Sequence, residues 1–209
     1  MTEYERCCVD GCNRRARRWS RYCEHHFERA RTTGGATGRI IRKQELKPYR
    51  EIAREWVDRN AGHPSVVAAV DWLRELVSEQ EGARFLAGEM ARLRNGTDPR
   101  AMLAAAIALW LQEDLSPRAL NDDRVFDTNM GRALLRCAPR PVKSVAPSGR
   151  KEQTRTTASH ARALGEHVRQ SLGALPLVAA KAIRDEVLGP ERTAATIREG
   201  LAVPFAPAE

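Results

Sequence analysis

Four of the five cysteines in this chain of 209 residues lie between positions 7 and 23. Cys7, Cys8 and Cys12 come first, and ten residues separate Cys12 from Cys23, with His26 three positions further on. So short a segment holds almost no apolar side chains, and it cannot build a core of its own. Thiolate and imidazole groups arriving as two pairs are the usual ligands of tetrahedral zinc. We therefore predict that the segment folds around a structural Zn²⁺ ion.

The two pairs of ligands can be placed on local structure. Gly11 permits a tight turn before Cys12, whose partner is either Cys7 or Cys8. The second pair has the C-x-x-H spacing that directs both side chains to one point at the start of a helix. Reduced cysteines in a small core are the plainer alternative. We favour metal because the segment has too little else to bury.

The N-terminal sequence and the length of the apolar runs indicate in which cellular compartment the protein is expected. The first six residues contain no apolar stretch of the kind that a signal peptide requires. The longest apolar run, residues 101–111, is shorter than the roughly 20 residues that a membrane helix needs. We expect a cytoplasmic protein without a membrane partner. Thiols stay reduced there, so clustered cysteines indicate metal binding more than disulfides.

The positive charge gathers at the same end of the chain. Lys and Arg number 35 against 27 Asp and Glu, and residues 1–50 hold 13 against 6, which is +7 of the net +8. Arginines on a metal-pinned loop can clamp phosphates, and phosphate contacts dominate nucleic-acid affinity. A solvated basic surface without a ligand is the plainer alternative. The predicted nucleic-acid-binding residues are Arg14, Arg15, Arg17, Arg18, Arg21, Arg29, Arg31, Arg39, Arg42 and Lys43.

Beyond the basic segment, prolines and glycines divide the chain into helical stretches with apolar residues at three- and four-residue spacing. Pro48 suits a first helical position, and Asp98 followed by Pro99 predicts a helix N-terminus. The stretch that follows is apolar nearly all round, as expected of the central helix of a bundle. The predicted helices are 48–60, 64–80, 83–94, 99–113 and 123–137, followed by two or three more at roughly 156–173, 176–188 and 190–200.

The fold class predicted is mostly α, with a small N-terminal zinc-binding module, a helical bundle as the body, and a C-terminal helical hairpin after a basic linker. Glycines 34, 35 and 38 mark the end of the module. The predicted division is a basic module at 1–38, a basic connector at 39–47, a helical domain at 48–137, a flexible basic linker at 138–155, C-terminal helices at 156–200 and a tail at 201–209.

The module carries a recognisable pattern: Cys-x-Val-x-Gly-Cys, an arginine-rich spacer, Cys-x-x-His between two aromatic residues, and a closing Arg-Thr-Thr-Gly. The residues in question are Cys7, Val9, Gly11, Cys12, Tyr22, Cys23, His26, Phe27 and residues 31–34. Over residues 7–38 this pattern resembles the small zinc finger at the front of phage and prophage HNH-type endonucleases and related mobile-element proteins. The resemblance implies that Cys7, Cys12, Cys23 and His26 bind zinc, with Cys8 and His25 spare.

The rest of the chain departs from that family. An HNH nuclease needs a histidine general base and further ligands for a catalytic metal. Outside the module the histidines are His63, His160 and His167, without an Asp-His pair or an Asn at useful spacing. Asp123 and Asp127 stand four apart and could face a metal, but capping and solvated charge are the plainer interpretation. No catalytic residue is therefore predicted.

We expect a zinc-stabilised nucleic-acid-binding protein, a DNA-binding regulator of transcription or replication from a phage or mobile element. Its basic finger would grip phosphates, and its helical body would bind a protein partner or supply specificity. Two alternatives stay open: a metal-dependent, HNH-related nuclease, and a protein-interaction adaptor with a purely structural finger. The remaining tryptophans, Trp56, Trp72 and Trp110, and Cys137 are interpreted as core residues.

Overall fold

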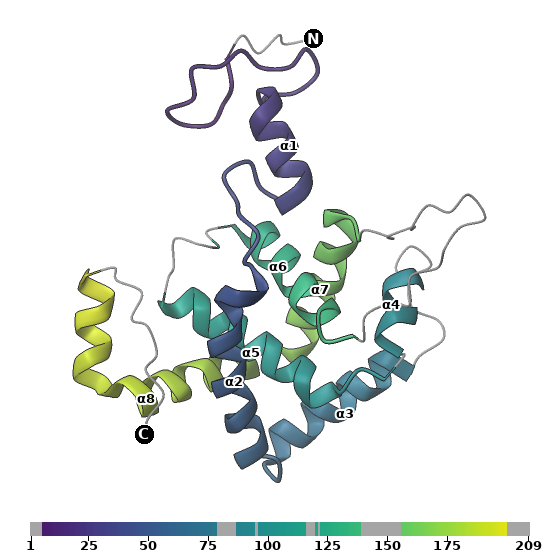
Figure 1. Cartoon of the computed structure of the whole chain (residues 1–209), viewed down its shortest axis with the longest axis vertical. Coiled ribbons are helices and arrows are strands. Elements are labelled where there is room, and N and C mark those ends of the chain that lie inside the picture. Colours follow the sequence, from purple (N-terminus) through teal and green to yellow (C-terminus); the bar gives the residue numbers. More distant parts are fainter. Residues whose placement is uncertain are drawn as a thin grey trace.

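The computed structural model describes residues 6–78, 87–94, 96–115, 120, 122–138 and 156–199, without the side chains of 87, 88 and 188–199. In this part of the chain there are eight helices and no strand longer than an isolated bridge, so the mostly α prediction is confirmed. The helices are α1 (Glu24–Thr33), α2 (Lys43–Arg59), α3 (Pro64–Ser78), α4 (Ala87–Arg94), α5 (Pro99–Leu115), α6 (Asp123–Leu135), α7 (Ala158–Leu172) and α8 (Leu175–Glu199). In Figure 1, α1 and the preceding loops stand as a small module on the helical body.

Helix α5 lies at the centre of the body, as its apolar sequence predicts. It packs against α2, α3, α6 and α8, and buries nearly every side chain between Met102 and Leu111. Asp98 caps its N-terminus by accepting a hydrogen bond from the backbone N–H of Arg100 at 2.9 Å. No helix in the described ranges has both the length and the apolar character needed to cross a membrane.

Helix α2 begins earlier than predicted. The predicted start at Pro48 is wrong, because α2 begins at Lys43 and takes in the end of the predicted connector. The carboxylate of Glu45 accepts a hydrogen bond from the backbone N–H of Arg42 at 2.6 Å and so stabilises the first turn. Pro48 lies in the second turn, where it removes only one hydrogen bond of the helix.

Two or three helices are predicted after residue 155, and the structure has two between residues 156 and 199. The stretches 176–188 and 190–200 are not separate, since α8 continues from Leu175 to Glu199 and bends in its C-terminal half (Figure 1). A proline inside a helix commonly bends it without ending it. Helices α7 and α8, which correspond to the predicted C-terminal hairpin, follow one another closely and pack on α6 and α5 respectively, so the C-terminal helices pack on the body. Most of the predicted linker (139–155) and the tail (201–209) lie outside the described residues.

The tightest helix pair in the body is α6 with α7. A Cβ atom at Gly131 would overlap the carbonyl oxygen of Ala161, and one at Gly165 would overlap that of Asp127. The two backbones therefore approach more closely than any larger side chain would permit. Across the same contact, Arg169 donates two hydrogen bonds to the buried carboxylate of Asp127, at 2.6 and 3.2 Å. This pairing gives Asp127 a structural role.

Helix α6 also holds the segment that leaves the N-terminal module. Gly34 ends α1 with a φ of 89°, and a Cβ there would lie 2.6 Å from Thr128 Oγ1. The buried Asn129 accepts a hydrogen bond from the backbone N–H of Ile41 at 2.8 Å and donates one to the carbonyl of Arg39 at 2.9 Å. The glycines thus permit close packing of the module's exit segment on α6.

Candidate metal centre and basic surface

The first pair of the cysteine cluster is set by a tight turn. The backbone N–H of Cys7 donates to the carbonyl of Arg14 at 2.9 Å, which closes the loop between them. The N–H of Cys12 donates to the carbonyl of Val9 at 3.0 Å, and Gly11 has a φ of 73°. That conformation favours glycine, and it turns Cys12 back towards Cys7.

The second pair stands at the start of α1. Cys23 is the N-cap residue, with extended backbone angles, and His26 lies in the first helical turn. The N–H of Phe27 donates to the carbonyl of Cys23 at 2.8 Å, which fixes this turn. The guanidinium of Arg17 lies 4.1 Å from the centre of the Phe27 ring and covers it. The C-x-x-H spacing therefore places both side chains on one side of the helix start.

The four ligand atoms form a compact group with the dimensions of a tetrahedral zinc site. They all lie within 4.8 Å of one another. The Sγ atoms of Cys12 and Cys23 are 3.9 Å apart, and His26 Nδ1 lies 3.3 Å from Cys7 Sγ and 3.5 Å from Cys23 Sγ. Ordinary Zn–S and Zn–N bond lengths give tetrahedron edges of about 3.8 Å between sulfurs and about 3.5 Å between sulfur and nitrogen. The cluster can therefore hold a metal ion, and its donor set fits zinc.

The geometry distinguishes the adjacent cysteines and histidines. Cys7 is 7% exposed and Cys23 is 2% exposed, and both point into the cluster. Cys8 and His25 are exposed and lie outside it. With four protein ligands, a tetrahedral ion would have no open position, and this is the arrangement of structural zinc sites.

The thiols show why the cluster favours a cation. Burial opposes ionisation of Cys7, but the backbone N–H groups of Cys23 and Val9 and the His26 side chain bring its pKa down to about 6. The backbone at Arg14 favours the thiolate of Cys12, but burial and the neighbouring Cys7 and Cys23 raise its pKa. A bound dication would offset this crowding of negative charge.

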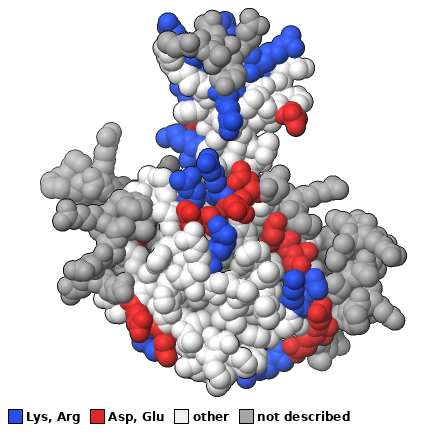
Figure 2. Space-filling view, turned by 180° about the vertical axis from the view of Figure 1, so that it is seen from behind, with Lys and Arg blue, Asp and Glu red and all other residues white. Residues whose placement is uncertain are grey.

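The basic residues predicted to bind nucleic acid lie on the surface in three groups. Five occupy the loop between the ligand pairs, two lie on α1, and three lie at the connector and the start of α2. Figure 2 shows Lys and Arg gathered over the module, with few acidic side chains among them. Among them, Arg17, Arg31 and Arg39 form salt bridges with nearby glutamates. All ten are exposed: Arg14, Arg15, Arg17, Arg18, Arg21, Arg29, Arg31, Arg39, Arg42 and Lys43.

The histidines outside the module are not brought together. His160 Nδ1 lies 3.2 Å from a carboxylate oxygen of Glu89, and the ring of His167 packs near Trp72. In the part of the chain that the structure describes, the Cys/His cluster of the module is the one group of side chains placed to hold a metal. Trp56, Trp72, Trp110 and Cys137 are partly buried against the core, in agreement with their interpretation as core residues.

Two arginines, Arg132 in α6 and Arg136 directly after its last residue, were not among the predicted residues. Arg132 donates to the carbonyl oxygen of Thr32 at 3.0 Å, and Arg136 donates to that of Ile41 at 2.9 Å. They lie one helical turn apart and face the module, although about 100 residues separate them from it in the sequence. In the sequence, only their spacing of four residues, in a helix that is mostly buried, could have indicated that the two side chains lie on one face.

Comparisons with known proteins identify no relative of this chain. A scan against protein-family models and searches of curated proteins and of solved structures found no match for this chain. The metal cluster, the charged surface and the resemblance of the module's motif are therefore the features that bear on function.

Proposed function

We propose that this chain is a nucleic-acid-binding protein in which a structural zinc ion organises a basic module that contacts phosphates. The observation that carries this proposal is the coincidence of the Cys7, Cys12, Cys23 and His26 cluster with an exposed set of arginines. A metal-pinned loop limits the backbone freedom of these arginines, so less conformational entropy is lost when they bind.

The zinc ion would act as a cross-link between the turn at Cys12 and the start of α1. Cys7, Cys12 and Cys23 would supply thiolates, and His26 would supply Nδ1. The loop between the pairs carries Arg14, Arg15, Arg17, Arg18 and Arg21, so holding its two ends fixes where these cations stand.

Trp19 supports a nucleic-acid ligand over a simple anion. Its side chain, in the loop between the ligand pairs, is 73% exposed, and the guanidinium of Arg18 lies 5.3 Å from the centre of its ring. A large apolar ring exposed among arginines is suited to stacking on a base while the cations contact phosphates. Such stacking is tolerant of sequence, because every base has a π-face.

DNA is the proposed nucleic acid, and regulation of transcription or replication in a phage or mobile element is the proposed role. Both rest on the resemblance of residues 7–38 to the finger of phage HNH-type endonucleases and related proteins. The helical body would supply a surface for a protein partner or contribute to specificity.

The test is binding of the intact, zinc-loaded protein to duplex DNA, single-stranded DNA and RNA over a range of salt concentrations. We expect affinity for DNA to fall steeply with salt, with a slope of about −0.9 per phosphate neutralised on duplex. Removal of zinc should abolish binding. Absence of binding to every nucleic acid at low salt would contradict the proposal and favour the adaptor alternative. Cleavage of plasmid DNA with magnesium or manganese would favour the nuclease alternative.

A further inference from the structure

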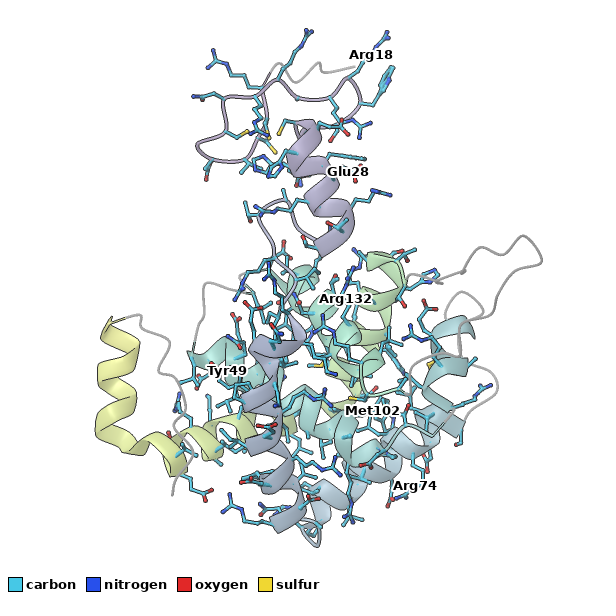
Figure 3. The ribbon with its side chains drawn as sticks, in the orientation of Figure 1. Arg18, Glu28, Tyr49, Arg74, Met102 and Arg132 are labelled. Atoms are coloured by element: carbon cyan, nitrogen blue, oxygen red, sulfur yellow. The ribbon has the colours of Figure 1, made fainter. Side chains whose placement is uncertain are left out.

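A cleft of about 1280 Å³ lies between the N-terminal module and the helical body. Its walls come from the loop before α1, the end of α1, the glycine segment, α6 and the start of α7. Arg132, labelled in Figure 3, stands at the junction of module and body. Six arginines line the cleft, Arg21, Arg31, Arg124, Arg132, Arg136 and Arg162, against the single carboxylate of Asp122. We call this site the arginine cleft.

Arg132 and Arg136 line the arginine cleft, and neither guanidinium forms a salt bridge with a carboxylate among the described residues. Arg132 and Arg136 are partly buried, and their guanidinium groups donate hydrogen bonds to backbone carbonyls. Among the described residues no carboxylate lies within ion-pair distance of either guanidinium, and Arg132 Nε is buried without a hydrogen-bond partner. Burial lowers the pKa of Arg132, and burial with the neighbouring charges of Arg132 and Arg50 lowers that of Arg136. Two partly desolvated cations one turn apart favour an anion between or above them.

The walls of the cleft carry two further arginines without a described carboxylate partner. Arg124 on α6 is exposed and Arg162 on α7 is partly exposed, and neither side chain has a carboxylate partner within the described ranges. The carboxylate of Asp122 is used at the start of α6, where it accepts the backbone N–H of Arg124 at 2.8 Å. The cleft is therefore a concave and predominantly positive surface, which focuses the electrostatic field on an anionic ligand.

The cleft is continuous with the surface proposed to bind nucleic acid. Arg21 and Arg31 belong to that surface and also line the cleft. A ligand with one negative charge at regular intervals can contact both regions at once, and arginine forms paired hydrogen bonds with phosphate oxygens. A free inorganic anion would fill only a small part of a cleft of this volume.

We propose that the arginine cleft binds the phosphodiester backbone of a nucleic acid between the zinc module and helices α6 and α7. This inference rests on the proposed function and makes it more specific: the body contributes phosphate contacts, and the ligand passes through the junction of module and body. Arg124 and Arg162 are binding residues in this account, and Arg132 and Arg136 both bind phosphate and hold the module in place.

The test compares three double variants of the full-length, zinc-loaded protein in binding to duplex and single-stranded DNA. The cleft variant is Arg124→Gln with Arg162→Gln, two side chains without a described ion pair whose loss should leave the fold intact. The module variant is Arg15→Gln with Arg18→Gln. The control, Arg74→Gln with Lys181→Gln, removes the same charge from α3 and α8. Thermal unfolding and zinc content of all three should match the parent protein.

We expect the cleft variant to bind DNA about tenfold more weakly and to show a salt slope smaller by about 2, roughly one unit for each lost phosphate contact. The control should change affinity by less than about threefold, since only long-range electrostatics is altered. Inorganic phosphate should compete only weakly, because it occupies one contact at a time.

Two results would overturn the inference while leaving the proposed function in place. One is a cleft variant that binds like the control while the module variant binds weakly. The other is a polyglutamate of equal charge that competes as well as DNA for the cleft, which would indicate an acidic protein ligand there. If the parent protein binds no nucleic acid at all, the proposed function fails, and the cleft inference fails with it.

Discussion

The N-terminal module and the helical body are stabilised by different means. Among the described residues up to Thr33, the apolar side chains that the module buries are Cys7, Ala16 and Cys23, and two of these belong to the metal cluster. The body buries a continuous apolar cluster around α5, with Leu103 and Ile107 fully enclosed. Apolar burial drives the folding of the body, whereas we propose that the module obtains its folding free energy largely from metal binding.

The largest expected effect comes from removing one metal ligand. Cys23→Ser should abolish zinc binding and unfold the module, since structural zinc contributes on the order of 10 kcal/mol to small metal-bound domains. The thermal unfolding of the body should change far less. Metal analysis and calorimetry measure the two effects. Cys8→Ser is the matched control, because Cys8 is exposed and outside the cluster. A Cys23→Ser variant that retains stoichiometric zinc would contradict the assignment.

The complementary change damages the body and spares the module. Gly131→Ala should destabilise the protein by about 3 kcal/mol, because the new methyl group would meet the backbone of Ala161 in the α6–α7 contact. Gly62→Ala is the control, since a Cβ there meets no atom within 4 Å. Denaturant unfolding monitored by circular dichroism gives the free energies, and zinc content should stay at its parent value. Equal stability of the two variants would show that α6 and α7 are packed less closely than described.

A smaller effect is expected where the two regions join. Asn129→Ala should cost about 2 kcal/mol, because it leaves the buried N–H of Ile41 and the carbonyl of Arg39 without their partner. Asn129→Asp keeps the acceptor for Ile41 but turns a buried carboxylate oxygen towards the carbonyl of Arg39, so it should also be destabilising. Chemical unfolding measures both variants. A neutral Asn129→Ala substitution would mean that the connector is not held by this side chain.

The smallest effect concerns pH and belongs to the body alone. Burial raises the pKa of Glu113 in α5 to about 7, above the value of about 4.3 expected in the unfolded chain. Between these values the unfolded chain releases the proton and the folded chain keeps it, so stability should fall as pH rises from about 4.5 to 7. Glu113→Gln should flatten this fall and leave the variant more stable by about 1 kcal/mol at pH 8. Unfolding curves at pH 5 and pH 8 test it, and parallel pH profiles of parent and variant would contradict it.

Local sequence signals were sufficient for the features that depend on neighbouring residues. The spacing of Cys23 and His26, the turn at Gly11 and the cap at Asp98 each act within a few positions, and the structure has them as expected. The all-apolar sequence of α5 likewise identified the centre of the body, because only a helix surrounded by others can bury every face.

Most of the features that the sequence did not indicate depend on distant contacts, and the early start of α2 is a local exception. The helical turn before Pro48 forms because Glu45 stabilises it, against the usual preference for proline at a helix start. The arginine cleft joins Arg21 and Arg31 to Arg132 and Arg162, which come from segments far apart in the chain. A periodic pattern in the sequence cannot predict that these arginines lie together, because the packing of α1 on α6 and α7 brings them together.

The most direct test of this account is hydrogen–deuterium exchange of the full-length protein, followed peptide by peptide before and after stoichiometric removal of zinc. The account predicts that residues 6–33 lose their protection on metal removal while α2, α3, α5 and α6 keep theirs, and that DNA binding is lost in the same samples. Protection of residues 6–33 that survives complete loss of metal, or exchange that rises equally over the whole chain, would contradict it.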